Sequence, residues 1–212
     1  NCAFKQDDLD KIKELCKEPI RTLFFGKAKQ YQFLVYEDID LRYPPIIGVD
    51  VAGGLYNDSS TITVVDSRTT KAVATLNCNY MPSDDLADVL YTLVTTKMSN
   101  GIINMERNGI GVSVLQRLCK TAVKKNLYYE IKDKVIEESF NGVRANRKTA
   151  RVKVYGTDSS KDVRARMIEI LYDRVAYHKD KFVASCIHHE LETMVVKRDG
   201  KVEHADKCHD DQ

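Results

Sequence analysis

The 212-residue chain has a hydrophobic fraction of 43% and a formal net charge of +2, values typical of one globular domain with a real core. No apolar run approaches the roughly 18–20 residues that a membrane-spanning helix needs, so no membrane segment is predicted. The six cysteines form no Cys-x-x-Cys pair, and the polar N-terminus does not resemble a secretion signal, so the cysteines are expected to be reduced thiols.

The first 45 residues are predicted to form a lead-in, ahead of a main domain over residues 46–212. Apolar residues at helical spacing indicate a helix over 7–17. Short apolar runs at 23–25 and 31–36 indicate two strands. A Pro-Pro pair then interrupts regular structure and separates the lead-in from the main domain.

The main domain alternates between strand-like and helix-like periods. The predicted elements are strands over 46–51, 61–65 and 72–80, a helix after Pro82, a strand over 102–106, a helix after Gly109, a strand over 127–131, a hairpin over 134–155, a helix after Ser160, a strand over 181–184, a helix over 185–192 and a hairpin around 197–201. This order predicts an α/β, RNase H-like fold with a central mixed β-sheet flanked by helices and a basic β-hairpin excursion.

Acidic residues close two of the apolar strands and recur at the C-terminus. Asp50 and Glu106 each end a strand, and neighbouring strands would bring both carboxylates to one edge of the sheet. Each also has a structural interpretation, because Asp50 can cap a turn and Glu106 can pair with Arg107. Asp210 and Asp211 stand at a predicted helix start, where an aspartate commonly caps the helix.

Carboxylates grouped in this way would repel one another, and a divalent cation removes that cost. Oxygen ligands favour Mg²⁺ or Mn²⁺. Two such ions roughly 3.5–4 Å apart can activate a water molecule and stabilise the leaving oxygen of a phosphodiester. The acidic pattern is compatible with that chemistry and also with a purely structural role.

A basic segment lies within an otherwise slightly acidic chain. Residues 143–166 carry a charge of +6, and the rest of the chain carries −4. Such a segment suggests contact with a polyanion, and a solvated surface face is the structural alternative. The candidate phosphate contacts are Arg144, Arg147, Lys148, Arg151, Lys153, Lys161 and Arg164.

Several segments, taken in chain order, resemble the motifs of one family. They are 47–54 with 58–62, an acid before Asn-x-x-Gly in 104–111, the stretch 158–164, Glu-Leu in 190–192, and His-Asp-Asp in 207–211. The ordered set resembles the nuclease domain of the large terminase subunit, the DNA-packaging protein of tailed bacteriophages, in the RNase H-like (RuvC-like) superfamily. The similarity runs from about residue 46 to the C-terminus.

The resemblance implies a two-metal Mg²⁺ or Mn²⁺ site with Asp50, Glu106 and one or both of Asp210 and Asp211 as ligands. It implies an endonuclease that cuts double-stranded, concatemeric viral DNA during genome packaging, with little sequence specificity. The implied partners are double-stranded DNA, a portal, a small terminase subunit and an ATPase domain in the same polypeptide. The implied location is the host cytoplasm and not the mature virion.

Relative to that family the chain is expected to be a separate nuclease domain. It contains no Gly-x-x-x-x-Gly-Lys-Ser/Thr loop, which an ATPase motor would need. Family members continue with apolar residues after His-Asp-Asp, so the chain is expected to be shortened near its last helix. His209 is a candidate auxiliary residue beside a phosphate or a metal-bound water, and Asp58 is either a nearby acid or a turn residue.

Other classes of protein remain open at this point. A Holliday-junction resolvase would share the fold, and a non-catalytic DNA- or protein-docking module would use the acids only to cap and bridge. An ATP-binding phosphotransferase would need a second glycine-rich phosphate loop, for which the segment after Glu106 is a poor candidate. The cysteines and histidines near the C-terminus match no standard spacing of a zinc site.

Overall fold

The computed structural model describes residues 2–53, 58–107, 109–140, 143–158, 160–197 and 200–205, without the side chains of 136–148, 161 and 204. A six-stranded mixed β-sheet forms its centre, and its strands are β1 (Arg21–Phe25), β2 (Tyr31–Val35), β3 (Ile46–Asp50), β4 (Ser60–Val65), β5 (Ala72–Cys78) and β6 (Ile102–Met105). Their order is β1-β2-β5-β4-β3-β6. The pair β3–β6 is parallel and the other neighbouring pairs are antiparallel.

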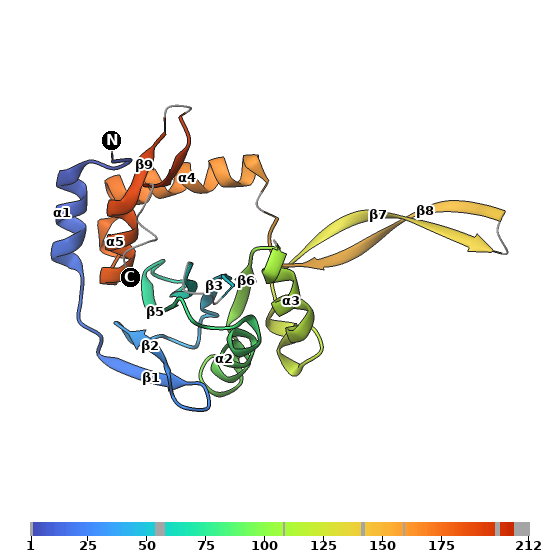
Figure 1. The fold of residues 1–212 in the computed structure, drawn as a ribbon, viewed down its shortest axis with the longest axis horizontal. Coiled ribbons are helices and arrows are strands. Elements are labelled where there is room, and N and C mark those ends of the chain that lie inside the picture. Colours follow the sequence, from blue (N-terminus) through green and yellow to red (C-terminus); the bar gives the residue numbers. More distant parts are fainter. Residues whose placement is uncertain are drawn as a thin grey trace.

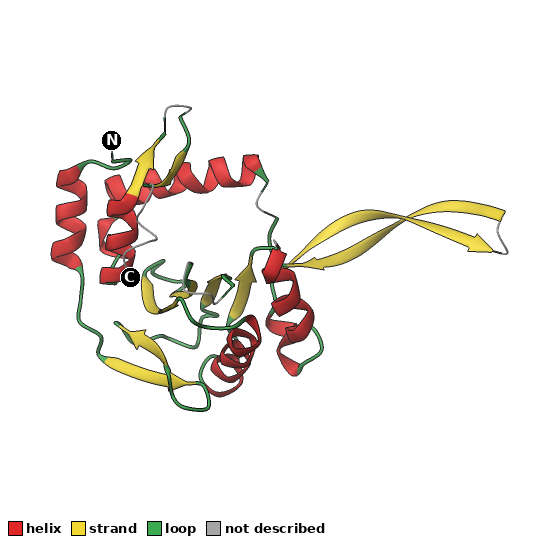
Figure 2. Cartoon of the chain, in the orientation of Figure 1, coloured by secondary structure: helices red, strands yellow, loops and turns green. Residues whose placement is uncertain are grey.

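Helices lie on both sides of this sheet, as Figures 1 and 2 show. They are α1 (Gln6–Leu15), α2 (Ser83–Thr96), α3 (Gly109–Leu118), α4 (Lys161–Tyr177) and α5 (Ser185–Thr193), with short 3₁₀ helices η1 (Ala122–Asn126) and η2 (Lys179–Lys181). In Figure 1, α2 and α3 lie on one side of the sheet, and α1, α4 and α5 lie on the other. Among the residues described, no helix combines the length and apolar character needed to cross a membrane.

The main core forms between the alternating apolar residues of the strands and the apolar residues at helical spacing in the helices. Strand β3 alternates, so that Ile47 and Val49 are buried in the core that includes residues of α2 and α3, while their neighbours face the other way. Helix α2 supplies Leu86, Leu90 and Leu93 to the same core. Each buried aliphatic side chain of this size contributes roughly 1.5–3 kcal/mol. This core fixes which face and which end of β3 and β6 remain open to solvent.

A second, smaller core joins the lead-in helix to the C-terminal helices. Leu9 and Ile12 of α1 pack with Val175 of α4 and Leu191 of α5. The lead-in strands enter the main sheet, because β2 pairs with β5. The division of the chain near residue 45 stays a prediction, and the sheet pairing shows how the two parts join.

The basic excursion is a β-hairpin, as predicted. Its strands β7 (Tyr129–Phe140) and β8 (Val143–Tyr155) pair antiparallel, from Tyr129 opposite Tyr155 to Phe140 opposite Val143. The predicted turn at residues 141–142 lies outside the described residues. The two strands form a separate ribbon that projects from the body in Figure 1.

One predicted strand is only partly right, and another is wrong. The run 127–131 is divided: Leu127 makes only an isolated bridge to Ile103, and the residues from Tyr129 onward belong to the hairpin. The run 181–184 begins with the last residue of η2, and of its residues only Phe182 makes a bridge, to Ala72. Both runs are short and apolar, and such runs do not by themselves determine a strand.

Candidate functional site

The structure brings Asp50 and Glu106 together at one edge of the sheet. Strands β3 and β6 run parallel, and their last paired residues are Val49 and Met105. Asp50 and Glu106 are therefore the next residues on two adjacent strand ends. Asp50 is exposed and Glu106 is partly buried. This is the arrangement expected from the sequence for two carboxylates at the carboxyl ends of parallel strands, where α/β sheets bind ligands.

A buried serine orders the chain directly after Asp50. The Ser60 hydroxyl accepts a hydrogen bond from the Ala52 amide at 3.0 Å and lies 3.4 Å from the Ala52 carbonyl oxygen. Ser60 is fully buried. Because Asp50 also pairs with Thr61, strand β4 holds the backbone that presents this carboxylate at two points, Asp50 and Ala52.

Glu106 lies in an electrostatic environment that disfavours its charged form. Burial raises the pKa of Glu106 above its ordinary value, and the negative charges of Asp50 and Asp158 raise it further. The positive charge of Arg164, in the first turns of α4, acts against this rise and lowers the same pKa. Three acids and one arginine therefore interact at this edge of the sheet, and a cation bound between the acids would relieve their repulsion.

Asp158 was not singled out from the sequence. The segment before it continues the sheet: the Thr157 amide donates to the Met105 carbonyl at 2.9 Å, and the Arg107 amide donates to the Thr157 carbonyl at 2.8 Å. Asp158 thus directly follows a residue that bridges to Glu106 at the end of β6. A signal was present in the sequence, because Asp158 is one of only two acids in the basic segment 143–166.

Four charged side chains form a network where the hairpin meets the body. Arg107 Nη2 donates to Glu130 Oε2 at 3.0 Å and lies 3.6 Å from Asp158 Oδ2. Lys132 Nζ lies 3.3 Å from an oxygen of each of the same two acids. The network is neutral overall and joins β6 to both strands of the hairpin, because Arg107 Nη1 also donates to the Val154 carbonyl at 3.5 Å.

The remaining predicted ligands are not placed. His209, Asp210 and Asp211 lie outside the described residues. Asp58 is exposed and precedes β4 by two residues, near the end of the strand pair that carries Asp50. Within the ranges that the structure describes, no group of three or more His, Cys, Asp or Glu side chains is arranged to hold a metal ion. Asp50 and Glu106 are thus the two members of the predicted ligand set that the structure juxtaposes.

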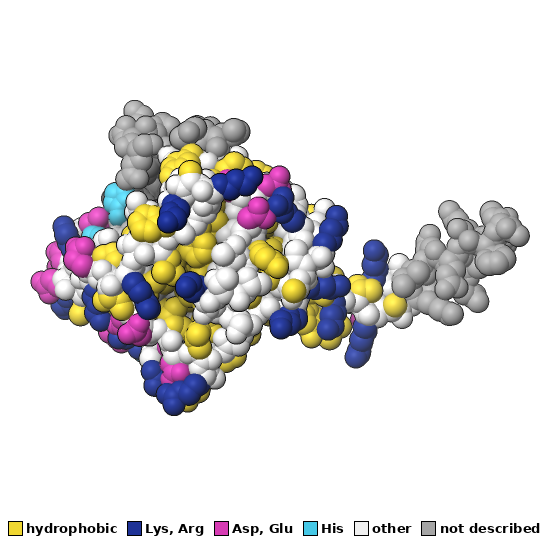
Figure 3. All heavy atoms as spheres, turned by 90° about the horizontal axis from the view of Figure 1, so that it is seen from below, with side chains coloured by type: hydrophobic (Ala, Val, Ile, Leu, Met, Phe, Trp, Pro, Cys, Tyr) yellow, Lys and Arg dark blue, Asp and Glu magenta, His cyan; other side chains and the backbone are white. Residues whose placement is uncertain are grey.

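Basic side chains gather at the root of the hairpin. Arg151 and Lys153 of β8 are exposed, as is Arg164 of α4. Lys153 lies over the Tyr129 ring, with Nζ 4.2 Å from the ring centroid, so its alkyl chain follows the ribbon. Figure 3 shows Lys and Arg side chains where the ribbon leaves the body. The side chains of Arg144, Arg147, Lys148 and Lys161 are outside the described part of the chain.

Replacing Glu106 with glutamine should change how stability depends on pH in the absence of metal. Burial and the neighbouring acids raise the pKa of Glu106, so the folded chain keeps this proton to a higher pH than the unfolded chain does. Stability therefore falls as pH rises through the interval between the two pKa values, and only in the parent. We expect the stability of Glu106→Gln relative to the parent to increase as pH rises above about 4, the ordinary pKa of glutamate, and to level off once Glu106 has lost its proton in the folded chain as well.

Chemical unfolding in EDTA across this pH range measures the difference. Glu14→Gln, a matched change at an exposed position of α1, is the control and should show no such trend. A constant difference between Glu106→Gln and the parent at every pH would show that neither burial nor the neighbouring acids raise the pKa of Glu106 in the folded chain.

The chain is similar to known proteins in its fold and not in its sequence. No protein-family model matches the chain, and neither does any curated protein sequence. Among solved structures, the large terminase nuclease from thermophilic phage G20c with bound magnesium is 17% identical, with a TM-score of 0.56, over 93% of this chain and 86% of that one. The same nuclease with bound zinc gives 17% identity and a TM-score of 0.54, over 92% and 91%.

A second phage protein supports the same comparison. The Thermus phage P74-26 large terminase nuclease domain is 15% identical, with a TM-score of 0.53, over 92% of this chain and 83% of that one. At these identities the likeness concerns the fold. The chain therefore has the mixed α/β, RNase H-like fold of the phage large terminase nucleases, as the order of its elements predicted.

Proposed function

We propose that this chain, with the fold of the phage large terminase nucleases, is a metal-dependent endonuclease that cuts double-stranded DNA during genome packaging. Its substrate would be concatemeric viral DNA, cut with little sequence specificity. The observation that carries the proposal is the juxtaposition of Asp50 and Glu106 at the ends of two parallel strands, beside a projecting ribbon with exposed basic residues.

The donor set fits a hard divalent cation. Carboxylate oxygens are the ligands that Mg²⁺ and Mn²⁺ prefer, and the mutual repulsion at Glu106 is the cost that such an ion removes. The large terminase nuclease from phage G20c has been solved with bound magnesium, cobalt or zinc. In the proposal, Asp50 and Glu106 hold the ion or pair of ions, Asp210 and Asp211 complete the ligand set, and His209 and Asp58 are auxiliary. The ions would polarise the phosphodiester and activate water.

The chain's own residues have two further tasks. Asp50, on a strand end fixed by Ser60 and by pairing with β4, presents a carboxylate in a set position before any ligand arrives. The basic residues Arg151, Lys153 and Arg164, with Arg144, Arg147, Lys148 and Lys161, would contact backbone phosphates and hold the duplex over the acids. Phosphate contacts carry no sequence information, which agrees with low specificity.

Removing basic side chains from the hairpin root should reduce the salt dependence of DNA binding. We expect Arg151→Gln with Lys153→Gln to lower the slope of log affinity against log salt by about 0.9 for each lost phosphate contact. Fluorescence anisotropy with a labelled duplex at several salt concentrations gives this slope. Lys27→Gln, at an exposed position in the turn between β1 and β2, is the control. An unchanged slope in the double variant would place the DNA elsewhere.

The wider setting is part of the same proposal. A packaging nuclease of this fold would act with an ATPase domain in the same polypeptide, a portal and a small terminase subunit, in the host cytoplasm. The support for this setting is the fold and the order of the sequence motifs.

The test of the proposed function is plasmid cleavage by the purified chain with EDTA, Mg²⁺ or Mn²⁺. Cutting that requires either metal supports the proposal. Folded protein that binds DNA and cuts in neither metal would contradict it and favour a docking module. Faster cleavage of branched than of linear DNA would instead indicate a junction resolvase.

A further inference from the structure

Arg107 occupies the junction between the strand that carries Glu106 and the root of the hairpin. It directly follows Glu106, and its backbone amide donates to the Thr157 carbonyl at 2.8 Å. Its side chain is only 14% exposed and contacts Glu130 of β7, the Val154 carbonyl of β8, and Asp158 beyond β8. One side chain therefore contacts both strands of the ribbon and the segment that leaves it.

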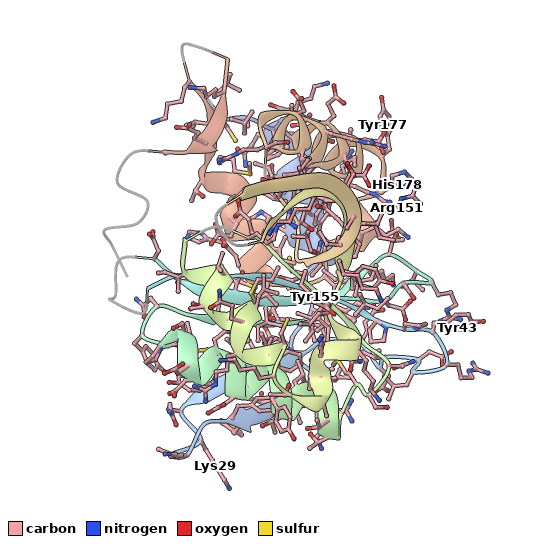
Figure 4. All side chains as sticks on the ribbon, turned by 90° about the vertical axis from the view of Figure 1, so that its right-hand side faces the viewer. Lys29, Tyr43, Arg151, Tyr155, Tyr177 and His178 are labelled. Carbon is pink, nitrogen blue, oxygen red and sulfur yellow. The ribbon has the colours of Figure 1, made fainter. Side chains whose placement is uncertain are left out.

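A hollow lies beside part of the hairpin root. It has a volume of about 430 Å³ and is lined by Arg107, Tyr155 and residues of α3 that include Val112 and Leu115. Figure 4 looks along the ribbon and places Tyr155 where it meets the body. The root thus borders a hollow beside Tyr155 and packs closely against Leu115 of α3 at Gly156. On the sheet side it is joined to β6 by backbone hydrogen bonds and by Arg107.

We infer that Arg107 is a positioning residue that couples the orientation of the hairpin to the position of Glu106. When DNA engages the ribbon, the force on β7 and β8 reaches β6 through the Arg107 guanidinium, one residue from the Glu106 carboxylate. The duplex and the acid pair are thereby held in a fixed relation. This inference rests on the proposed function, because the hairpin must contact the DNA that Glu106 helps to cut.

The guanidinium suits this task better than an ammonium group. Its planar fork reaches an acid on β7 and a carbonyl on β8 at the same time, whereas lysine provides a single charged point. Partial burial strengthens these contacts relative to an exposed ion pair, since less water competes for them. Glu130 and Asp158 together carry two negative charges, and Arg107 balances one of them. Lys132 balances the other, so the two acids can remain side by side around the Arg107 guanidinium.

The test compares Arg107 variants in two forms of the chain. In the short form, residues 134–150 are replaced by Asn-Gly, which joins the paired residues Asp133 and Arg151 through a two-residue hairpin turn. Cleavage rates are measured at saturating DNA, so that weaker binding does not enter. In the full chain, Arg107→Gln should lower this rate by about tenfold or more, and Arg107→Lys should restore part of the loss.

In the short form, Arg107→Gln should cause a clearly smaller loss than in the full chain, because most of the ribbon is gone and only the root residues Arg151 and Lys153 are left to contact DNA. An equal loss in the full and short forms would overturn the inference, since Arg107 would then act locally. No loss in either form would overturn it as well.

Hydrogen exchange supplies a readout that needs no cleavage. Backbone amides in 129–133 and 151–155 should exchange faster in Arg107→Gln than in the parent. The matched control is Arg117→Gln, which removes an α3 arginine paired with Asp84 and Asp88 of α2 at 2.8 and 2.7 Å, away from the ribbon. Unchanged exchange in Arg107→Gln would refute the coupling. If the parent does not cut DNA, the proposed function fails, and the exchange measurement still decides whether Arg107 braces the ribbon.

Discussion

Asp50→Asn should lower the rate of metal-dependent DNA cleavage by about a thousandfold or more, while DNA affinity stays the same or rises. Asparagine has nearly the same shape as aspartate, and Asp50 is an exposed strand end, so the backbone pairing with Thr61 should survive. The substitution removes the negative charge that would hold a cation beside Glu106. It also removes a charge that repels DNA phosphates, which is why binding should not weaken.

Single-turnover cleavage and duplex binding by anisotropy, both with Mn²⁺, measure the two effects separately. Asp10→Asn, a matched change at an exposed position of α1, should alter neither. Full cleavage activity in folded Asp50→Asn would remove this residue from the site. Equal losses of binding and cleavage would indicate a role in holding DNA and not in the reaction.

Gly156→Ala should destabilise the fold by roughly 2–4 kcal/mol, which corresponds to a fall in melting temperature of roughly 5–15 °C. Gly156 has φ of +80°, a conformation that L side chains rarely adopt. A Cβ atom there would lie 2.6 Å from the Met105 carbonyl oxygen, 2.8 Å from Leu115 Cδ1 and 2.9 Å from Arg107 Cγ. The first of these is backbone of β6, so the strand itself would have to shift.

Thermal and chemical unfolding measure this loss, and Gly200→Ala separates its two causes. Gly200 also has φ of +80°, but its added Cβ would meet nothing within 4 Å. Gly200→Ala should therefore lose only about 1 kcal/mol, the cost of the backbone conformation alone. Equal losses at Gly156 and Gly200 would mean that the close approach of the hairpin root to β6 is not as tight as the structure indicates.

The elements that were predicted well are those with a clear local period. The strand alternation around Ile47 and Val49 and the helical spacing of Leu86, Leu90 and Leu93 are properties of short windows, and they determined most of the fold. The strand over 127–131 was right only from residue 129 onward, because tertiary contacts decide where it begins. The Asn126 side chain donates to the Ser99 and Gly101 carbonyls at 3.0 and 2.8 Å, which holds the end of η1 in place directly before this run.

Only the part of the candidate site that depends on short sequence windows was predictable. That Asp50 and Glu106 end apolar strands is visible in the sequence, and the parallel pairing of β3 and β6 then places them side by side. The partners of Arg107 were not predictable, because Glu130 and Asp158 are brought to it by the register of a hairpin more than twenty residues long. No short window contains the information that joins these positions.

The length of the hairpin can be compared with a length of DNA duplex. Strand β7 has 12 residues, and at about 3.3 Å per residue it extends roughly 40 Å from its root. Along a duplex that rises about 3.4 Å per base pair, this is roughly twelve base pairs, slightly more than one helical turn. If the ribbon follows the duplex, a DNA end closer than that to the acids leaves part of the ribbon without a partner. The chain would then favour cuts inside long DNA over trimming of short ends.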